Sequence, residues 1–223
     1  MNKISAIPLL LLFGSTAFGQ VLDSSGNPDT SYPGFYAWFD ASDGVNGSGQ
    51  PNDGDSATMW VDNTGNGHDL IRVSGDVTRQ PVFRASAANG APALEFDGND
   101  FIWANQTTEF GEIAGAKTMF IVAEVDATDV SSYIFDSCTG AGRNALLTGQ
   151  QASPDQWQIW TGTGLAGANG TPINRDVFEI HTLMIDAGLQ EHAIGGAMQY
   201  TGAEGAQALK GFLLGSRYTT SDA

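Results

Sequence analysis

Turn-forming residues interrupt this chain so often that no long helix fits it. Glycine contributes 29 of the 223 residues, and Asn, Asp and Ser gather beside it, as in 63–67 and 97–100. Between these clusters lie short runs rich in β-branched and aromatic residues, without the i, i+3, i+4, i+7 apolar spacing of an amphipathic helix. The pattern predicts an all-β fold of short strands, a sandwich or a barrel.

The expected strands follow the runs between turn signals. They are 35–40, 58–61, 69–73, 93–96, 101–104, 117–125, 132–135, 144–148, 156–161, 179–186, 192–199 and 210–215. A short helical turn is expected within 107–116, and the glycine-rich stretch 162–170 is expected to be a loop. No repeat or linker divides 34–223, so this part is expected to form one domain, preceded by a polar lead over 20–33.

The N-terminus has the layout of a secretory signal peptide. Lys3 precedes an apolar stretch centred on 9–13, and Ala17-Phe18-Gly19 fits the small-x-small cleavage rule. The stretch is short for a membrane span, which needs roughly 20 residues. We expect cleavage of 1–19 and a secreted or cell-surface protein without membrane insertion after cleavage.

The net charge limits the kinds of ligand this protein can bind, and the cysteine content shows how its fold can be stabilised. The formal net charge is −16, and such a surface repels nucleic acid and anionic membranes while suiting neutral ligands or divalent cations. Excess acid also serves solubility. The chain has one cysteine, Cys138, so no intrachain disulfide can stabilise it and the fold depends on its core.

Five segments stand out in order along the chain. They are the first expected strand at 36–44, the W-x-D-x-T-G-N-G-x-D hairpin at 60–69, the N-G-x-P-A-L-x-F-D-G segment at 89–98, the strand at 118–123 and the L-L-G-S-R strand at 213–217. Together they resemble bacterial laminin G-like domains of the concanavalin A-like lectin/glucanase superfamily. The resemblance implies a two-sheet antiparallel jelly-roll sandwich. It also implies a further closing strand after 217 that this sequence lacks, so we expect either truncation at the C-terminus or an open sheet edge.

No expected strand carries a complete set of catalytic acids. Glucanases of this superfamily carry three acids at alternate positions of a strand, which places them on one face. The nearest matches, Glu95-Phe96-Asp97 and Glu124-Val125-Asp126, lack the third acid, so we interpret both as structural. Paired carboxylates can also lie far apart in a chain, which leaves a glycosidase open.

The histidines and serines show no other catalytic pattern. His68, His181 and His192 form no zinc motif, and no G-x-S-x-G is present.

A glycan site is expected beside Trp160. In an extended 156–161, Trp157 and Ile159 face the core, whereas Gln156, Gln158 and Trp160 share the other face. An indole with amides can stack on a pyranose and hydrogen-bond its hydroxyls. Arg143 and Asn144 are expected to join this face from a neighbouring strand; the alternative is that Trp160 only covers the sheet rim.

Calcium is a second expected ligand. Asp62, Asn63 and Asn66 lie on one turn and Asp97 and Asp100 on another, and hard cations prefer such oxygens. Relatives with this fold often hold calcium at the rim. The alternative is that these side chains only cap their turns.

These observations favour a secreted, non-catalytic recognition module for glycan or extracellular matrix, with calcium at the sheet rim. Two alternatives stay open: a polysaccharide-degrading enzyme or its accessory domain, and a structural cell-envelope protein.

Overall fold

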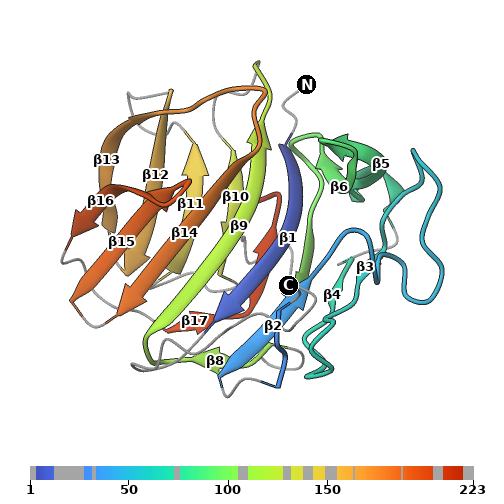
Figure 1. Cartoon of the computed structure of the whole chain (residues 1–223), viewed down its shortest axis with the longest axis horizontal. Coiled ribbons are helices and arrows are strands. Elements are labelled where there is room, and N and C mark those ends of the chain that lie inside the picture. Colours follow the sequence, from blue (N-terminus) through green and yellow to red (C-terminus); the bar gives the residue numbers. More distant parts are fainter. Residues whose placement is uncertain are drawn as a thin grey trace.

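The computed structural model describes residues 4–12, 28–31, 34–72, 76–104, 110–127, 132–137, 143–148, 155–162, 164–186, 188–202 and 208–217, with the backbone alone for 4–12, 143 and 164–170. Two eight-stranded antiparallel sheets face each other, which confirms the predicted all-β sandwich (Figure 1). The described part contains no helix with the length and apolar character of a membrane span.

The first sheet contains strands from both ends of the chain. Its order is β16 (Ala197–Gly202), β15 (Leu189–Ile194), β14 (Glu179–Asp186), β9 (Lys117–Val125), β1 (Ile4–Leu12), β6 (Ala91–Phe96) and β5 (Val82–Ala88), and β2 (Phe35–Phe39) also pairs with β1. The segment predicted to be the export signal therefore supplies a central strand (Figure 1).

The second sheet is assembled from shorter strands. Its order is β13 (Gly164–Pro172), β12 (Gln156–Gly162), β11 (Arg143–Thr148), β10 (Tyr133–Asp136), β18 (Phe212–Leu214), β7 (Ile102–Ala104), β4 (Leu70–Ile71) and β3 (Met59–Trp60). A small sheet of β8 (Glu112–Ile113) and β17 (Leu209–Lys210) and a 3₁₀ helix at Val77–Arg79 complete the described elements.

The core lies between the two sheets and follows the two-residue period of the strands. On β9 the odd-numbered residues are buried, and the side chains between them, Glu124 among them, are half-buried. Met119 and Ile121 belong to the same buried cluster as Trp157 and Ile159 of β12 in the opposite sheet. Alternation places the even-numbered residues of β9 on the outer face of the first sheet.

Three expected elements need correction. The single strand expected over 192–199 is a hairpin of β15 and β16, because Gly195 and Gly196 take φ values of +57° and +81° and reverse the chain. The loop expected over 162–170 is largely β13, which pairs along β12 despite its glycines. The described part of the expected helical turn, 110–116, contains β8 instead.

Some expectations fall outside the described residues. Cys138 and the cleavage region around Gly19 belong to this group, as does most of the polar lead. Removal of 1–19 stays a prediction.

Candidate functional site

An ion pair joins β5 and β6 on the outer face of the first sheet. Arg84 donates from Nε and Nη2 to the two carboxylate oxygens of Glu95, each at 3.0 Å. The pKa of Arg84 is raised, chiefly by this hydrogen bond and also by the charges of Glu95 and Asp53. Glu95 points outward because its neighbours Leu94 and Phe96 point into the core.

Glu124 lies in the same row, on β9, which is two strands from β6 with β1 between them. Ser5 of β1 is in register with Glu95 on one side and with Glu124 on the other. With neighbouring strands 4.7–4.9 Å apart, the two glutamates leave backbones about 9.5 Å apart. Burial raises the pKa of Glu124, helped by the charges of Asp176 and Asp126.

Both glutamates line one cavity of about 410 Å³, which we call the carboxylate cavity. Its remaining walls are Asp53, Arg84, Ala85, Ser86, Ala87 and Phe178. Asp53 is anchored because its Oδ1 accepts a hydrogen bond of 2.9 Å from the backbone N–H of Ala85. The carboxylate cavity therefore holds three acids and one guanidinium.

A second cavity of about 430 Å³, the neighbouring cavity, shares Arg84 and Glu95 with the first. It is also lined by Gln80, Asp97 and Asp100, with Ser56, Val77, Thr78 and Val82. Gln80 is 4% exposed, and its Nε2 has no hydrogen-bond partner among the described residues. Burial raises the pKa of Asp100 to about 7, since this side chain is 3% exposed.

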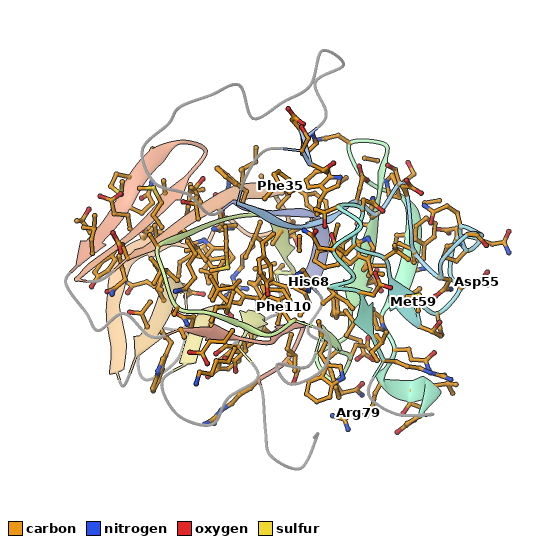
Figure 2. All side chains as sticks on the ribbon, turned by 90° about the horizontal axis from the view of Figure 1, so that it is seen from below. Phe35, Asp55, Met59, His68, Arg79 and Phe110 are labelled. Atoms are coloured by element: carbon orange, nitrogen blue, oxygen red, sulfur yellow. The ribbon has the colours of Figure 1, made fainter. Side chains whose placement is uncertain are left out.

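Figure 2 shows the surroundings of this region from below. The loop of Asp55 and the 3₁₀ helix that ends at Arg79 lie at the same end of the molecule. Asp55 accepts a backbone hydrogen bond of 2.8 Å from Phe83 of β5, and its loop thereby carries Asp53 to the sheet. Loop and helix thus flank the two cavities.

The expected glycan face is built differently from the prediction. Trp157 is 1% exposed and packs in the core, whereas Trp160 is half-buried on the other face, as expected. Gln158, however, is 1% exposed, so little of it is available to a ligand. Gln156 is half-buried.

Of the two β11 residues expected to join Trp160, Asn144 points elsewhere and the side chain of Arg143 is not described. Asn144 is in register with Thr161, so it points to the face opposite Trp160 and is fully buried. Its Nδ2 donates to the carbonyl of Ala208. The side chain of Arg143 lies outside the described part of the structure.

The expected calcium residues form turn caps. The carboxylate of Asp62 accepts hydrogen bonds from the backbone N–H groups of Trp38, Thr64 and His68, and from the Thr64 hydroxyl. The Nδ2 of Asn66 donates to the carbonyls of Phe35 and Tyr36, and the backbone of Asn63 donates to that of Trp38.

Asp97 and Asp100 likewise serve their own turn. Asp100 accepts from the backbone of Asp97, which in turn accepts from the backbone of Asn99. No group of three or more His, Cys, Asp or Glu side chains suited to a metal ion occurs within the described residues. These carboxylates serve as caps of their own turns, and the calcium site stays a prediction.

The histidines occupy two different environments. His68 stacks on Tyr36 with ring centroids 4.2 Å apart and lies next to Phe110 (Figure 2). His181 and His192 are both buried between the sheets, with Nδ1 of His181 3.0 Å from Nε2 of His192. Neither environment adjoins the carboxylate cavity.

Sequence reasoning found Glu95 and Glu124 but dismissed them, and it missed Arg84, Asp53 and Gln80. The glucanase motif places its acids at alternate positions of one strand, whereas here the two glutamates come together across strands. The one signal available was that Glu95 and Glu124 each lie on a predicted strand at an outward position.

Known enzymes share this architecture. A GH54 α-L-arabinofuranosidase soaked with a cyclic sulfate inhibitor matches with a TM-score of 0.54 and 16% identity, over 73% of this chain and 44% of that one. An arabinofuranosidase complexed with arabinofuranosyl-alpha-1,2-xylobiose matches with a TM-score of 0.48 and 17% identity, over 75% and 48%. An alginate lyase of polysaccharide lyase family 7 matches with a TM-score of 0.39 and 9% identity, over 69% of this chain and 73% of that one.

The chain thus spans less than half the length of the arabinofuranosidases, and the first match shows a shared fold. The two antiparallel sheets and this match show a jelly-roll sandwich. No family model and no curated protein matches the sequence, and the laminin G-like assignment stays a prediction.

The predicted non-catalytic recognition module is corrected by these findings. The solved structure that shares the fold, the GH54 α-L-arabinofuranosidase, is that of an enzyme. The expectation of no catalysis also rested on the absence of three acids along one strand. That argument no longer holds, because Glu95 and Glu124 line one cavity from different strands. The alternative of a polysaccharide-degrading enzyme is the better supported of the two.

Proposed function

We propose that this protein is a polysaccharide-degrading enzyme, a glycoside hydrolase that uses Glu124 and Glu95 as its pair of carboxyl groups. The proposal depends on one observation: the two side chains line one cavity from strands that are separated by a single strand. Glycoside hydrolysis characteristically needs two such groups, one on each side of the scissile bond.

The surroundings of the two groups suit different roles. Burial and nearby acids raise the pKa of Glu124, which favours the protonated form that a general acid needs. Glu95 receives two hydrogen bonds from the Arg84 guanidinium, which favours an ionised carboxylate that can activate water. We therefore assign Glu124 as acid and Glu95 as base.

The spacing supports inversion of the anomeric configuration. Inverting enzymes keep their carboxyl groups roughly 6.5–9.5 Å apart to admit water, whereas retaining enzymes hold them at roughly 5–5.5 Å. With backbones about 9.5 Å apart and both side chains on one face, the two glutamates have the width of a strand between them, which can admit the water that the wider class needs. This spacing holds for any strand that occupies the position of β1.

The charge of the two cavities favours a neutral glycan. Asp53, Glu95, Glu124, Asp97 and Asp100 line them together, against the single Arg84. A uronate-rich chain would meet repulsion there, whereas neutral hydroxyls can donate hydrogen bonds to the carboxylates. We propose that the neighbouring cavity receives an adjoining sugar unit.

Export and family membership are part of the same proposal. A secreted or cell-surface enzyme would meet its polymer outside the cell, in keeping with the predicted signal peptide. The motifs at 60–69 and 89–98 support a laminin G-like origin of the sandwich.

The test is an assay of neutral polysaccharides, such as arabinan, arabinoxylan, xylan and β-glucan, beside alginate and pectate. Glu124→Gln and Glu95→Gln should each lower the rate on the neutral substrate by about 10²–10⁴-fold. Glu191→Gln is the matched control, because Glu191 is half-buried on the same sheet and lines neither cavity.

The pH profile and the product supply two further readouts. Activity should fall as pH rises through the raised pKa of Glu124, because the acid then loses its proton. Nuclear magnetic resonance of the first product should show the inverted anomer. Unsaturated products, full activity in both glutamate variants, or no turnover on any polymer would refute the proposal.

A further inference from the structure

The centre of the first sheet depends on a segment that the sequence marks for removal. β1 pairs along its whole length with β9, and on its other side with β6 over Ile4–Ala6 and with β2 over Leu9–Leu12. Figure 1 shows it between β9 and β6. The same nine residues contain the apolar centre of the predicted export signal.

The flanking strands carry core residues. Leu9 of β1 is in register with Ile121 of β9 and with Phe39 of β2, which are 1% and 0% exposed. Without β1, one side of β9 and the facing sides of β6 and β2 would lose their backbone partners. Unpaired backbone groups beside a buried core are costly, so the position has to be filled.

The gap cannot close by itself at low cost. β9, β6 and β2 all run antiparallel to β1, so they run parallel to one another. Direct pairing of β6 with β9 would require a parallel ladder within an otherwise antiparallel sheet, and the two strands would have to approach each other by about 4.8 Å in total. One antiparallel strand satisfies all three neighbours.

The leader is suited to this position. Proline cannot donate to a ladder and is found at bulges or edges of sheets. Pro8 is the only proline of β1, and it lies where the register with β9 shifts, between Ile7 and Leu9. The remaining residues of β1 can donate on either side.

We propose that the space between β9 on one side and β6 and β2 on the other is a strand-accepting site, the slot, and that its occupant is the chain's own Ile4–Leu12. Folding of the unprocessed chain sequesters the leader as β1. Removal of the leader before folding leaves the slot for another extended apolar segment in the same direction. This inference is independent of the proposed function, since its test needs no substrate.

Hydrogen exchange on the full chain, produced without export, tests the slot directly. Alternate residues of β9 direct their N–H groups to β1 and the others to β14. Leu10→Pro, in the middle of β1, should accelerate exchange of the first set at least about tenfold and leave the second set protected. Pro8→Ala is the control, because the bulge position contributes no donor to begin with.

A second measurement asks whether the segment stays bound without its covalent link. A recognition sequence for a specific protease is inserted between Gly19 and Gln20 and cut after folding. We expect the leader fragment to remain with the domain in size-exclusion chromatography under native conditions, with β9 still protected. Separation of the fragment with unchanged exchange in β9, or equal and fast exchange of both sets of amides in the intact chain, would overturn the proposal.

Discussion

At the scale of single residues, burial holds two histidines uncharged inside the sandwich. The pKa of His181 is lowered to about 3 by burial and by His192, and that of His192 is lowered to about 4 by burial. In the unfolded chain both would titrate near 6.5. Between pH 6.5 and 4 the unfolded chain therefore binds protons that the folded chain does not, and the free energy of unfolding falls as pH falls.

We predict that His181→Gln flattens this pH dependence. Each histidine contributes a slope of up to about 1.4 kcal/mol per pH unit in that range, and the variant loses one of the two contributions. Urea unfolding of both proteins at pH 7, 6 and 5 measures the difference. Asp100 has the opposite effect: because its pKa is raised to about 7, its protonation stabilises the folded chain as pH falls. This contribution is the same in both proteins, so it cancels in the difference between them. Parallel curves for the two proteins would show that His181 is charged or exposed in the fold.

A second prediction at this scale concerns the two tryptophans of β12. Trp157 is buried, stacks edge-on against His181 and donates to Glu179, whereas Trp160 is half-buried and packs on Tyr133 and Leu147. Trp157→Ala should cost about 3–5 kcal/mol, as large-to-small core changes do. Trp160→Ala should cost less than half of that, because its ring loses less burial. Thermal and urea unfolding test the order, and the reverse order would mean that the register of β12 is wrong.

At the scale of elements, the β15–β16 hairpin depends on two glycines in the left-handed region. An added Cβ at Gly196 would meet no atom within 4 Å, so Ala there is penalised by its φ of +81° alone. We predict that Gly196→Ala lowers the free energy of unfolding by about 1–2 kcal/mol. Gly49→Ala is the control, because that site is equally open and lies outside the left-handed region. Equal effects of the two changes would contradict the observed turn.

At the scale of the whole molecule, the net charge of −16 makes the folded state repel itself. Raising NaCl from about 10 to 150 mM shortens the screening length from about 30 to 8 Å. We predict that this raises the melting temperature by about 2–4 °C, equivalent to roughly 1 kcal/mol for a chain of this size. A fall in melting temperature would mean that attractive ion pairs, such as Arg84 with Glu95, outweigh the repulsion.

Calcium chloride at the same ionic strength separates screening from specific binding. A larger rise than NaCl produces, abolished by Asp97→Asn, would support the predicted calcium site. An equal rise in melting temperature with the two salts would mean that the acidic side chains only cap their turns and bind no calcium.

The sequence anticipated the elements better than their partners. Lys117–Val125 was predicted residue for residue, and the inward and outward faces of β9 and β12 follow from alternation. Fold class followed from the same local signals. These features are determined locally, because side-chain direction along a strand depends only on the extended backbone and the solubility of each side chain.

Strand pairing needed the tertiary structure. The glycines of 164–170 indicated a loop, but pairing with β12 makes them a strand, and the export-signal pattern of Ile4–Leu12 gave no hint of a central strand. Which strands become neighbours depends on the whole sandwich closing its ladders and core, a requirement that no local pattern expresses.

The sequence by itself determined an all-β chain of acidic surface whose glutamates at 95 and 124 point outward. Only the tertiary structure decided that these two share a cavity with Arg84, since they lie on β6 and β9 and meet through their common register with Ser5. It likewise placed Asn144 on the face opposite Trp160, because the register of β11 against β12 sets that face. The physical reason is the same in both cases: alternation is a property of one strand, whereas register is a property of two, and a shift by one residue moves every side chain to the other face.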